Sequence, residues 1–276
     1  MEPPRMNRFF AADGRCFNVA IDHGFFGETA FLNGIEDAQA AVDTVSAAGP
    51  DAMQLSPGQA PLLQSQPGPD KPALVLRTDI ANIYGQDLPD VLFSHLIEDA
   101  VGTAVRLDAA ALCVNLFDLE GRPEIHEACV VNVTRLVADA KAAGMPVMVE
   151  PLVMRQSDRG YTSNGDTDRI RTLVRQAVEL GADVIKADPT DDPAEYHRVI
   201  EAAGRVPVLV RGGGRVDDQT LLERTFAVMQ QGARGIVYGR NVVQHPNPRG
   251  ITQALMAVVH DGASPDDAAH VLDASQ

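Results

Sequence analysis

The amino-acid sequence predicts a (β/α)8 barrel, also called a TIM barrel, and three observations favour this fold class. Short apolar runs recur eight times along the chain, and most of them are followed by a loop and a stretch with helical periodicity. Small residues and a glycine precede several runs, as in "KAAGMP" and "VELGAD", which is typical of a helix that ends and turns into a strand. The chain has 276 residues, and one barrel of this kind needs about 250.

The eight apolar runs are predicted to be parallel strands, because strands that are covered on both faces have continuous apolar sequences. In chain order the predicted strands are Phe17–Ile21, Ala52–Ser56, Ala73–Arg77, Ala111–Leu116, Pro146–Glu150, Asp183–Ala187, Pro207–Arg211 and Gly235–Gly239.

Helical periodicity predicts helices over Glu36–Ala48, Glu124–Ala143, Thr167–Leu180, Pro193–Ala203, Asp217–Gln231 and Gly250–His260. The segments between the second and fourth strands are less periodic, and helices are expected there only from the repeating order of elements. The tail "ASPDDAAHVLDASQ" is predicted to form a short terminal helix on the surface or at a subunit contact.

A doubly wound open sheet is the rival fold. Such sheets usually carry a G-x-G-x-x-G fingerprint after the first strand, whereas the first strand here leads into "DHGFFGE". No linker or shift in composition divides the chain, so we expect one barrel domain over residues 1–276.

Composition excludes several classes of partner. The formal net charge of −15 is unfavourable for binding nucleic acid or an anionic membrane. No apolar run is long enough for a signal peptide or a bilayer span. The three cysteines are too few and scattered for a disulfide framework, and the seven histidines lack the spacing of a metal site. We therefore expect a cytoplasmic protein without a metal.

Polar residues follow many of the predicted strands, at the end of the barrel where active sites form. They are Asp22 and His23 after the first strand, Arg77 and Asp79 at the third, Asn115 at the fourth, Glu150 at the fifth, Lys186 in the sixth and Arg211 at the seventh. Arg77, Asp79, Asn115 and Arg211 either orient substrate hydroxyls or a second anion, or form ion pairs that hold the mouth of the barrel together.

Lys186 is the least expected of these residues, because burying an unpaired ammonium is costly. Strand alternation places it on the same face as Val184 and opposite Ile185. If that face lines the barrel, burial favours a neutral amine, which attacks a carbonyl carbon and yields a protonated imine. The alternative is a structural ion pair with Asp22 or Glu150.

The carboxylates at the strand ends are candidates for proton transfer. Asp22 and His23 are adjacent, so their side chains leave the chain in different directions, and Asp22 is predicted to point inward. His23 is either a substrate-binding residue or a structural histidine. Glu150 precedes Pro151, which restricts it to an extended conformation at the predicted end of its strand.

Glycine-containing segments follow the last two strands and predict an anion site. Gly212, Gly213 and Gly214 come after Arg211, and Gly239 with Arg240 follows the eighth strand. Glycines let backbone N–H groups approach an anion closely, and this pair of loops often binds phosphate in barrels. We therefore predict that these residues hold a substrate phosphate.

Four motifs in order, between about residues 18 and 260, carry a family resemblance: "AIDHGFFGE", "GADVIKADPTDD", "VPVLVRGGG" and "GRNVVQHPNP". The sequence resembles the class I (Schiff-base) aldolase superfamily, in the group of archaeal and bacterial fructose-bisphosphate aldolases and deoxyribose-phosphate aldolase. The resemblance implies that Lys186 forms the Schiff base without another cofactor and that Asp22 takes part in proton transfer. It also implies a phosphate bound by the glycine loops and Arg240, and a homo-oligomer.

One departure concerns the acid–base residue. The archaeal-type enzymes carry a tyrosine general acid shortly after the fifth strand, where this chain reads "MVEPLVMRQ". The "VEP" is similar to tagatose-bisphosphate and sulfofructose-phosphate aldolases, whose glutamate has that duty, which implies Glu150 here. The segment "ADPTDD" also differs from the family's "TYYTGD", so the substrate is not defined by the resemblance.

We therefore predict a carbon–carbon lyase that reversibly cleaves a phosphorylated ketose or keto-sugar acid. The first alternative is an acyl-transfer or transaldol-type carbon–carbon bond enzyme on the same scaffold. A metal-dependent aldolase is the second, and a non-catalytic sugar-phosphate-binding protein is the third.

Overall fold

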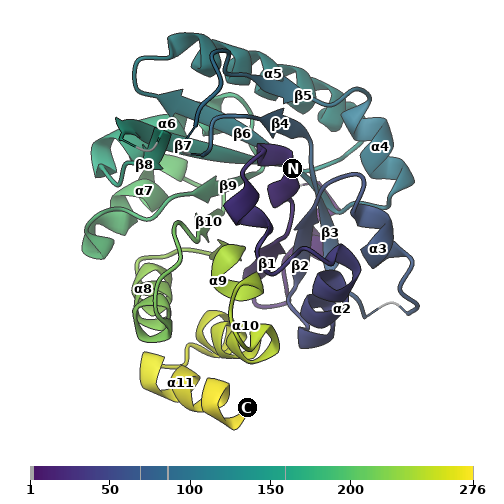
Figure 1. Ribbon diagram of the computed structural model, residues 1–276, viewed down its shortest axis with the longest axis vertical. Coiled ribbons are helices and arrows are strands. Elements are labelled where there is room, and N and C mark those ends of the chain that lie inside the picture. Colours follow the sequence, from purple (N-terminus) through teal and green to yellow (C-terminus); the bar gives the residue numbers. More distant parts are fainter. Residues whose placement is uncertain (1–2, 69, 86, 159, 276) are drawn as a thin grey trace.

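The strands of the computed structural model form one closed parallel barrel (Figure 1). The structure describes residues 3–68, 70–85, 87–158 and 160–275. The barrel strands are β1 (Cys16–Ala20), β2 (Ala52–Leu55), β3 (Ala73–Arg77), β6 (Ala111–Leu119), β7 (Val147–Ser157), β9 (Val184–Ala187), β10 (Val208–Arg211) and β11 (Gly235–Tyr238). Pairings of β1 with β11 and of β6 with β7 close the ring, so the predicted (β/α)8 fold is confirmed.

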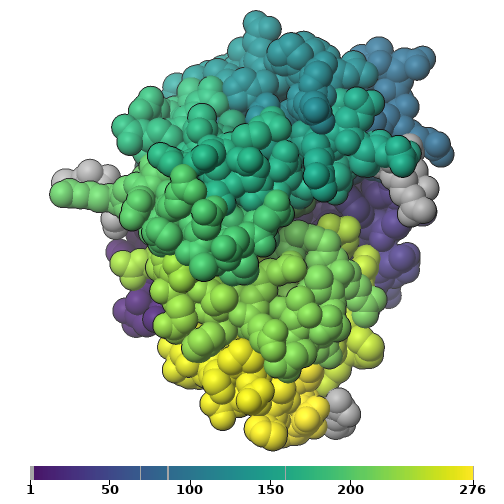
Figure 2. All heavy atoms as spheres, turned by 90° about the vertical axis from the view of Figure 1, so that its left-hand side faces the viewer, coloured from purple at the N-terminus to yellow at the C-terminus, as the bar shows by residue number. Residues whose placement is uncertain are grey.

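Helices form the outer layer, and those of the second half cover the side shown in Figure 2. Their bounds lie within a few residues of the predicted ranges: α2 (Ala38–Ala48), α5 (Pro123–Ala142), α6 (Thr167–Glu179), α7 (Tyr196–Ala203), α8 (Asp218–Gln230) and α10 (Pro248–Met256). Asp37, Asp166 and Asp217 cap the N-termini of α2, α6 and α8 by accepting a backbone hydrogen bond, which explains where these helices begin.

Shorter helical segments complete the chain. They are α1 (Met6–Phe9), η1 (His23–Phe26), η2 (Thr29–Leu32), α3 (Ala60–Gln64), α4 (Ala100–Arg106), η3 (Pro193–Glu195), α9 (Arg240–Val243), the π-helical turn η4 (Ala257–Asp261) and the terminal helix α11 (Pro265–Ala274). The predicted helix over Gly250–His260 thus divides into α10 and a π turn. No described helix has the length and apolar composition that a bilayer span requires.

The fifth barrel strand differs from its prediction. Glu150 does not close the strand, because β7 continues through Pro151 to Ser157 and turns back as β8 (Gly160–Ser163). Strand β9 pairs with β7 only as far as Val149, so the missing N–H of Pro151 costs no hydrogen bond on that side. On the other side β6 follows β7 up to Met154, and the two strands project together beyond the barrel.

A second hairpin was not predicted. Strands β4 (Asp79–Ala81) and β5 (Ser94–Leu96) pair antiparallel between β3 and α4. Asn132 of α5 donates a hydrogen bond to the backbone oxygen of Ser94, which ties the hairpin to the outer helix layer. The connection between β4 and β5 supplies Tyr84 to the mouth of the barrel.

Alternating residues of the strands divide the apolar core in two. The outer core between strands and helices contains Val149 and Ile185, whereas Met148 and Val184 belong to the cluster inside the barrel. Met6 and Phe9 of α1 join that inner cluster and close the N-terminal end. The interior of the barrel is therefore apolar at its N-terminal end. Beyond Val184, toward the C-terminal end, it is lined by charged residues such as Lys186.

Candidate active site

Lys186 lies inside the barrel at its C-terminal end. Its strand neighbour Ile185 packs in the outer core and Val184 in the inner cluster, as the alternation predicted. The lysine is 4% exposed. Its Nζ lies 2.9 Å from Oε2 of Glu150 and 3.5 Å from Oε1 of Gln54. We expected burial to favour a neutral amine, whereas the structure shows the alternative that the sequence also allowed, a salt bridge with the carboxylate of Glu150.

Glu150 contacts three cationic side chains of the pocket. Besides Lys186, its carboxylate contacts Arg77 and Nε of Arg211, the latter at 3.1 Å. Burial works to raise the pKa of Glu150, but the three cations outweigh it and hold the pKa well below its usual range. Glu150 is therefore ionised at neutral pH and can accept a proton.

Asp22 is the second carboxylate of the pocket, and it points inward as predicted. Its Oδ2 accepts hydrogen bonds from Nε2 of Gln54 and Nε of Arg77, both at 2.7 Å. Burial raises the pKa of Asp22, but Arg77 and Lys186 more than compensate and lower it. Asp22 is thus a second ionised carboxylate of the pocket that can accept a proton.

Arg77 forms ion pairs with several acidic side chains, so its guanidinium is not a free group for binding substrate. Its guanidinium donates to Asp22, to Glu150 and to Asp79, the last at 3.2 Å. Asp79 also accepts hydrogen bonds from Asn115, at 2.8 Å from Nδ2. Asn115 lines none of the described cavities at this end, so its predicted contact with substrate is not supported by its position. Its side chain orients Asp79 instead.

The predicted anion site lies at the rim of the same pocket. Gly212, Gly213 and Gly239 line it together with Arg240, whereas Gly214 lies farther out, in a connected groove. Nη2 of Arg240 donates to the backbone oxygen of Gly213 at 2.9 Å, and its guanidinium lies 4.7 Å from the ring centroid of Phe31. These contacts fix a cation beside glycine backbone, which suits an anion.

Arg211 joins the anion site to the acid–base residues. Its Nε contacts Glu150, and its Nη1 donates to Oδ1 of Asp188 at 2.7 Å and to Oγ of Ser163 at 3.3 Å. Asp188 was not predicted as a site residue. It follows Lys186 by two positions, so the same alternation that placed the lysine inside was the signal for it.

His23 lies against the glycine of the eighth strand. A Cβ added to Gly239 would lie 2.4 Å from Cε1 of His23, so this glycine is required for close packing as well as for any anion contact. Burial lowers the pKa of His23 to about 4, with Asp22 opposing and Arg240 assisting. The imidazole is therefore neutral near neutral pH. Its Nδ1 is buried and has no hydrogen-bond partner among the described residues.

The pocket around Lys186 is small, about 50 Å³, and it opens into an outer groove of about 680 Å³. Phe31, Tyr84, Arg211, Gly213 and Arg240 line both spaces. A substrate can therefore place its reacting carbon at the lysine and extend past the two arginines. Sequence reasoning did not identify the aromatic residues Phe26, Phe31 and Tyr84, which reach the pocket through loops with no periodic pattern.

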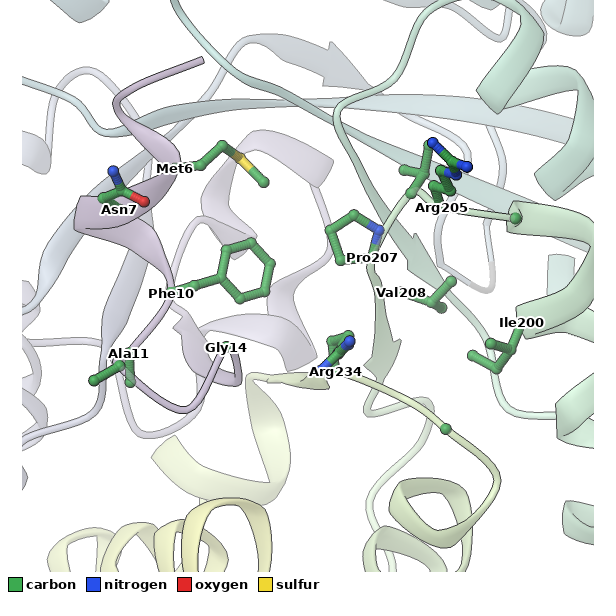
Figure 3. Close-up of a pocket in the computed structure, with 14 residues that line it drawn as sticks. Met6, Asn7, Phe10, Ala11, Gly14, Ile200, Arg205, Pro207, Val208 and Arg234 are labelled. Atoms are coloured by element: carbon green, nitrogen blue, oxygen red, sulfur yellow. The ribbon is translucent and has the colours of Figure 1, made fainter. Parts of the chain in front are cut away.

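A larger cavity, about 860 Å³, lies at the opposite end of the barrel (Figure 3). Met6 and Phe10 face Pro207 across it, and Arg205 and Arg234 are its charged residues. Among the described residues, neither a lysine nor a carboxylate lines it, so they do not supply the groups that imine chemistry requires. Within the described residues, no group of three or more His, Cys, Asp and Glu side chains is arranged to hold a metal ion.

Comparison with known proteins gives consistent results. Residues 16–245 match the family model described as DeoC/LacD family aldolase. The chain is 31% identical over 265 residues to a 2-amino-3,7-dideoxy-D-threo-hept-6-ulosonate synthase of Halobacterium salinarum, covering 96% of this chain and 93% of that one. It is 29% identical over 260 residues to a 3-hydroxy-5-phosphonooxypentane-2,4-dione thiolase of Photorhabdus laumondii, covering 93% and 81%.

Solved structures agree with the sequence relatives. An archaeal fructose 1,6-bisphosphate aldolase superimposes with a TM-score of 0.77 at 25% identity, covering 94% of this chain and 98% of that one. A structure of an archaeal fructose-1,6-bisphosphate aldolase with its catalytic lysine covalently bound to the carbinolamine intermediate of the substrate has a TM-score of 0.76 at 25% identity, covering 92% of this chain and 98% of that one.

Proposed function

The chain belongs to the DeoC/LacD family of aldolases, and from that premise we propose that Lys186 is the residue that forms its Schiff base. Family membership makes the protein an enzyme, a carbon–carbon lyase that acts through a lysine imine on a phosphorylated ketose or keto-sugar acid. The observation that carries the proposal for Lys186 is its amine inside the barrel, 2.9 Å from a carboxylate of Glu150 and beside Asp22.

In the proposed reaction, the amine of Lys186 adds to the substrate ketone, and loss of water gives the protonated imine. Glu150, with Asp22, takes the proton from the hydroxyl group beta to the imine. The carbon–carbon bond then breaks, its electrons move to the iminium nitrogen, and an aldehyde and an enamine result. Protonation of the enamine carbon and hydrolysis release the second product and restore the lysine.

The substrate phosphate is proposed to bind at Arg211, Arg240, Gly212, Gly213 and Gly239, with Gly214 at the outer edge and His23 behind Gly239. A dianion at this place competes with Glu150 for Arg211 and adds negative charge nearby. Both effects would raise the lowered pKa of Glu150 toward the range that a general base needs. Phosphate binding would thus prepare the carboxylate for proton transfer.

Reduction with sodium borohydride in the presence of phosphorylated ketoses tests the nucleophile. We expect one covalent adduct, located on Lys186 by mass spectrometry, and unchanged trapping after treatment with a chelator. Lys186→Met should abolish the adduct. The matched control is Lys141→Met, which removes a surface lysine of α5 and should leave trapping unchanged. Loss of activity with chelator, without any adduct, would show that the imine proposal is wrong.

Acyl transfer is the second candidate function, because relatives at 29% identity are thiolases by name. Cleavage and transfer give different products from the same ketone. Product analysis with and without a thiol acceptor separates them: an acylated thiol identifies transfer, and an aldehyde formed regardless of the acceptor identifies aldol cleavage.

Several further properties are part of the same proposal. The chain is proposed to be one domain that works in the cytoplasm as a homo-oligomer, without a cofactor other than its own lysine. Nucleic acid and membranes are not expected partners, since the net charge of −15 disfavours both.

A further inference from the structure

Tyr84 occupies the boundary between the lysine pocket and the outer groove and lines both. Three aromatic rings from separate segments surround its ring, with centroid distances of 5.1 Å to Phe26, 5.4 Å to Phe31 and 6.2 Å to Phe117. These edge and tilted contacts hold the phenol in one orientation. The ring is thus fixed by packing, and these ring contacts do not involve its hydroxyl group.

The hydroxyl group of Tyr84 is the only hydroxyl on the wall of the lysine pocket, as far as the described residues show. No hydrogen bond joins it to another described residue. The charged groups that act on it are Arg211, Glu150, Arg77 and Asp188, so it faces the charge cluster that surrounds Lys186. A fixed hydroxyl with no partner among the described residues, in the same pocket as the proposed reacting amine, is available to a substrate atom.

Imine formation needs a proton donor at this place. When an ammonium and a ketone give a protonated imine and water, nitrogen loses two protons and the departing oxygen gains both. Glu150 and Asp22 have lowered pKa values and are ionised, so they accept protons rather than donate them. His23 is neutral, because its pKa is lowered to about 4. Burial raises the pKa of Tyr84, which keeps the phenol protonated and able to donate.

We infer that Tyr84 is a further catalytic residue, whose phenol gives a proton to the substrate oxygen that leaves as water during imine formation. This inference rests on the proposed function of Lys186. As the carbon–oxygen bond of the carbinolamine breaks, the oxygen takes the phenolic proton and the nitrogen lone pair completes the carbon–nitrogen double bond. The phenolate, beside Arg211, regains a proton that the lysine nitrogen has released to Glu150. The phenol therefore relays protons, and none is needed from outside.

Tyr84→Phe tests this role, because it removes the hydroxyl and keeps the ring among its aromatic neighbours. The probe is dihydroxyacetone phosphate, a short phosphorylated ketone, with cyanoborohydride to trap the imine. We expect the rate of adduct formation on Lys186 to fall at least about 100-fold. Affinity for inorganic phosphate and the thermal unfolding temperature should stay as in the wild type.

Tyr196→Phe is the matched control. Its hydroxyl lies 3.5 Å from the backbone oxygen of Ala187, on the outer side of the barrel, and its loss should leave trapping unchanged. Trapping of Tyr84→Phe at the wild-type rate would overturn the catalytic role, as would an equal fall in phosphate affinity, which would indicate binding alone. If the wild type itself forms no adduct on Lys186, the proposed function fails, whatever Tyr84 does.

Discussion

Glu150 neutralises more than one cation at once: it contacts Lys186, Arg77 and Arg211 in the interior of the barrel. An unpaired buried charge would destabilise the fold, and the network reduces this cost because each cation is paired with the Glu150 carboxylate. The same pairing binds the amine and the base to each other. We infer that substrate binding has to separate them.

Glu150→Gln tests the network through stability. The substitution removes the carboxylate and leaves three cations near each other, so we expect the free energy of unfolding to fall by about 3 kcal/mol or more. Urea unfolding at pH 7 measures it. Glu223→Gln is the control, since that exposed residue of α8 accepts a hydrogen bond from Gln219 on the protein surface and should change stability by less than about 0.5 kcal/mol.

The pH dependence of this difference has a definite sign. The folded pKa of Glu150 lies below its unfolded value of about 4.3. Its contribution to stability is therefore complete above that unfolded value and is lost as the pH falls below it. The gap between wild type and Glu150→Gln should be constant from pH 6 to 8 and shrink below about pH 4. A gap that grows in acid would contradict the assignment.

The barrel strands were predictable as elements because their signal is local. A continuous apolar run with a glycine before it is typical of a strand that is covered on both faces. Barrel strands that follow one another along the chain are also adjacent in the sheet. The two hairpins were not predictable in this way. Strand β5 (Ser94–Leu96) depends on Asn132 of α5, and β8 (Gly160–Ser163) on the extension of β7 past Pro151, so both require tertiary contacts.

The π turn η4 (Ala257–Asp261) is attached to the N-terminal end of the barrel by His260. Its Nδ1 lies 2.8 Å from Asp13 and its Nε2 2.9 Å from Asp51. Asp51 also accepts the backbone N–H of Phe17, at the start of β1. The hydrogen bond to Asp51 and the contact with Asp13 outweigh burial and raise the pKa of His260 to about 9.

His260→Gln should therefore remove a pH-dependent part of the stability. A folded pKa above the unfolded value of about 6.5 gives a contribution that is complete below pH 6.5 and is lost as the pH rises through 9. Allowing for partial exposure, we expect about 1–2 kcal/mol at pH 6 and little difference from wild type at pH 10. Thermal unfolding across this range measures it, with the exposed His270→Gln on α11 as control. Equal pH profiles for His260→Gln and wild type would contradict the ion pair.

At the scale of the whole molecule, the barrel closes where its first and last strands meet. Gly235 begins β11 with φ of +141°, and a Cβ there would lie 1.8 Å from the backbone oxygen of Cys16. The pairing of Cys16 with Gly235 starts the seam between β1 and β11. Only glycine permits this approach, so closure of the ring depends on one position.

Gly235→Ala is expected to lower the free energy of unfolding by about 3 kcal/mol, because the chain must move at the seam and the backbone is strained. Denaturant unfolding measures it. Gly58→Ala is the control, since no atom lies within 4 Å of the added Cβ and the backbone is not in the positive-φ region. If both substitutions prove neutral, the seam does not require glycine.

The sequence by itself determined the fold class and the positions of the eight barrel strands, because strand periodicity and helix caps depend on neighbouring residues, but it did not determine where β6 and β7 end. It also determined that Lys186 shares a face with Val184, since alternation is a local property, and the structure decided that this face lines the barrel. Only the tertiary structure decided which charges pair, that Asn115 supports Asp79 rather than the pocket, and that Tyr84 lines the same pocket as the lysine. Lys186 and Gln54 are 132 residues apart in the chain, and their contact exists only because the ring closes and brings all strand ends to one place.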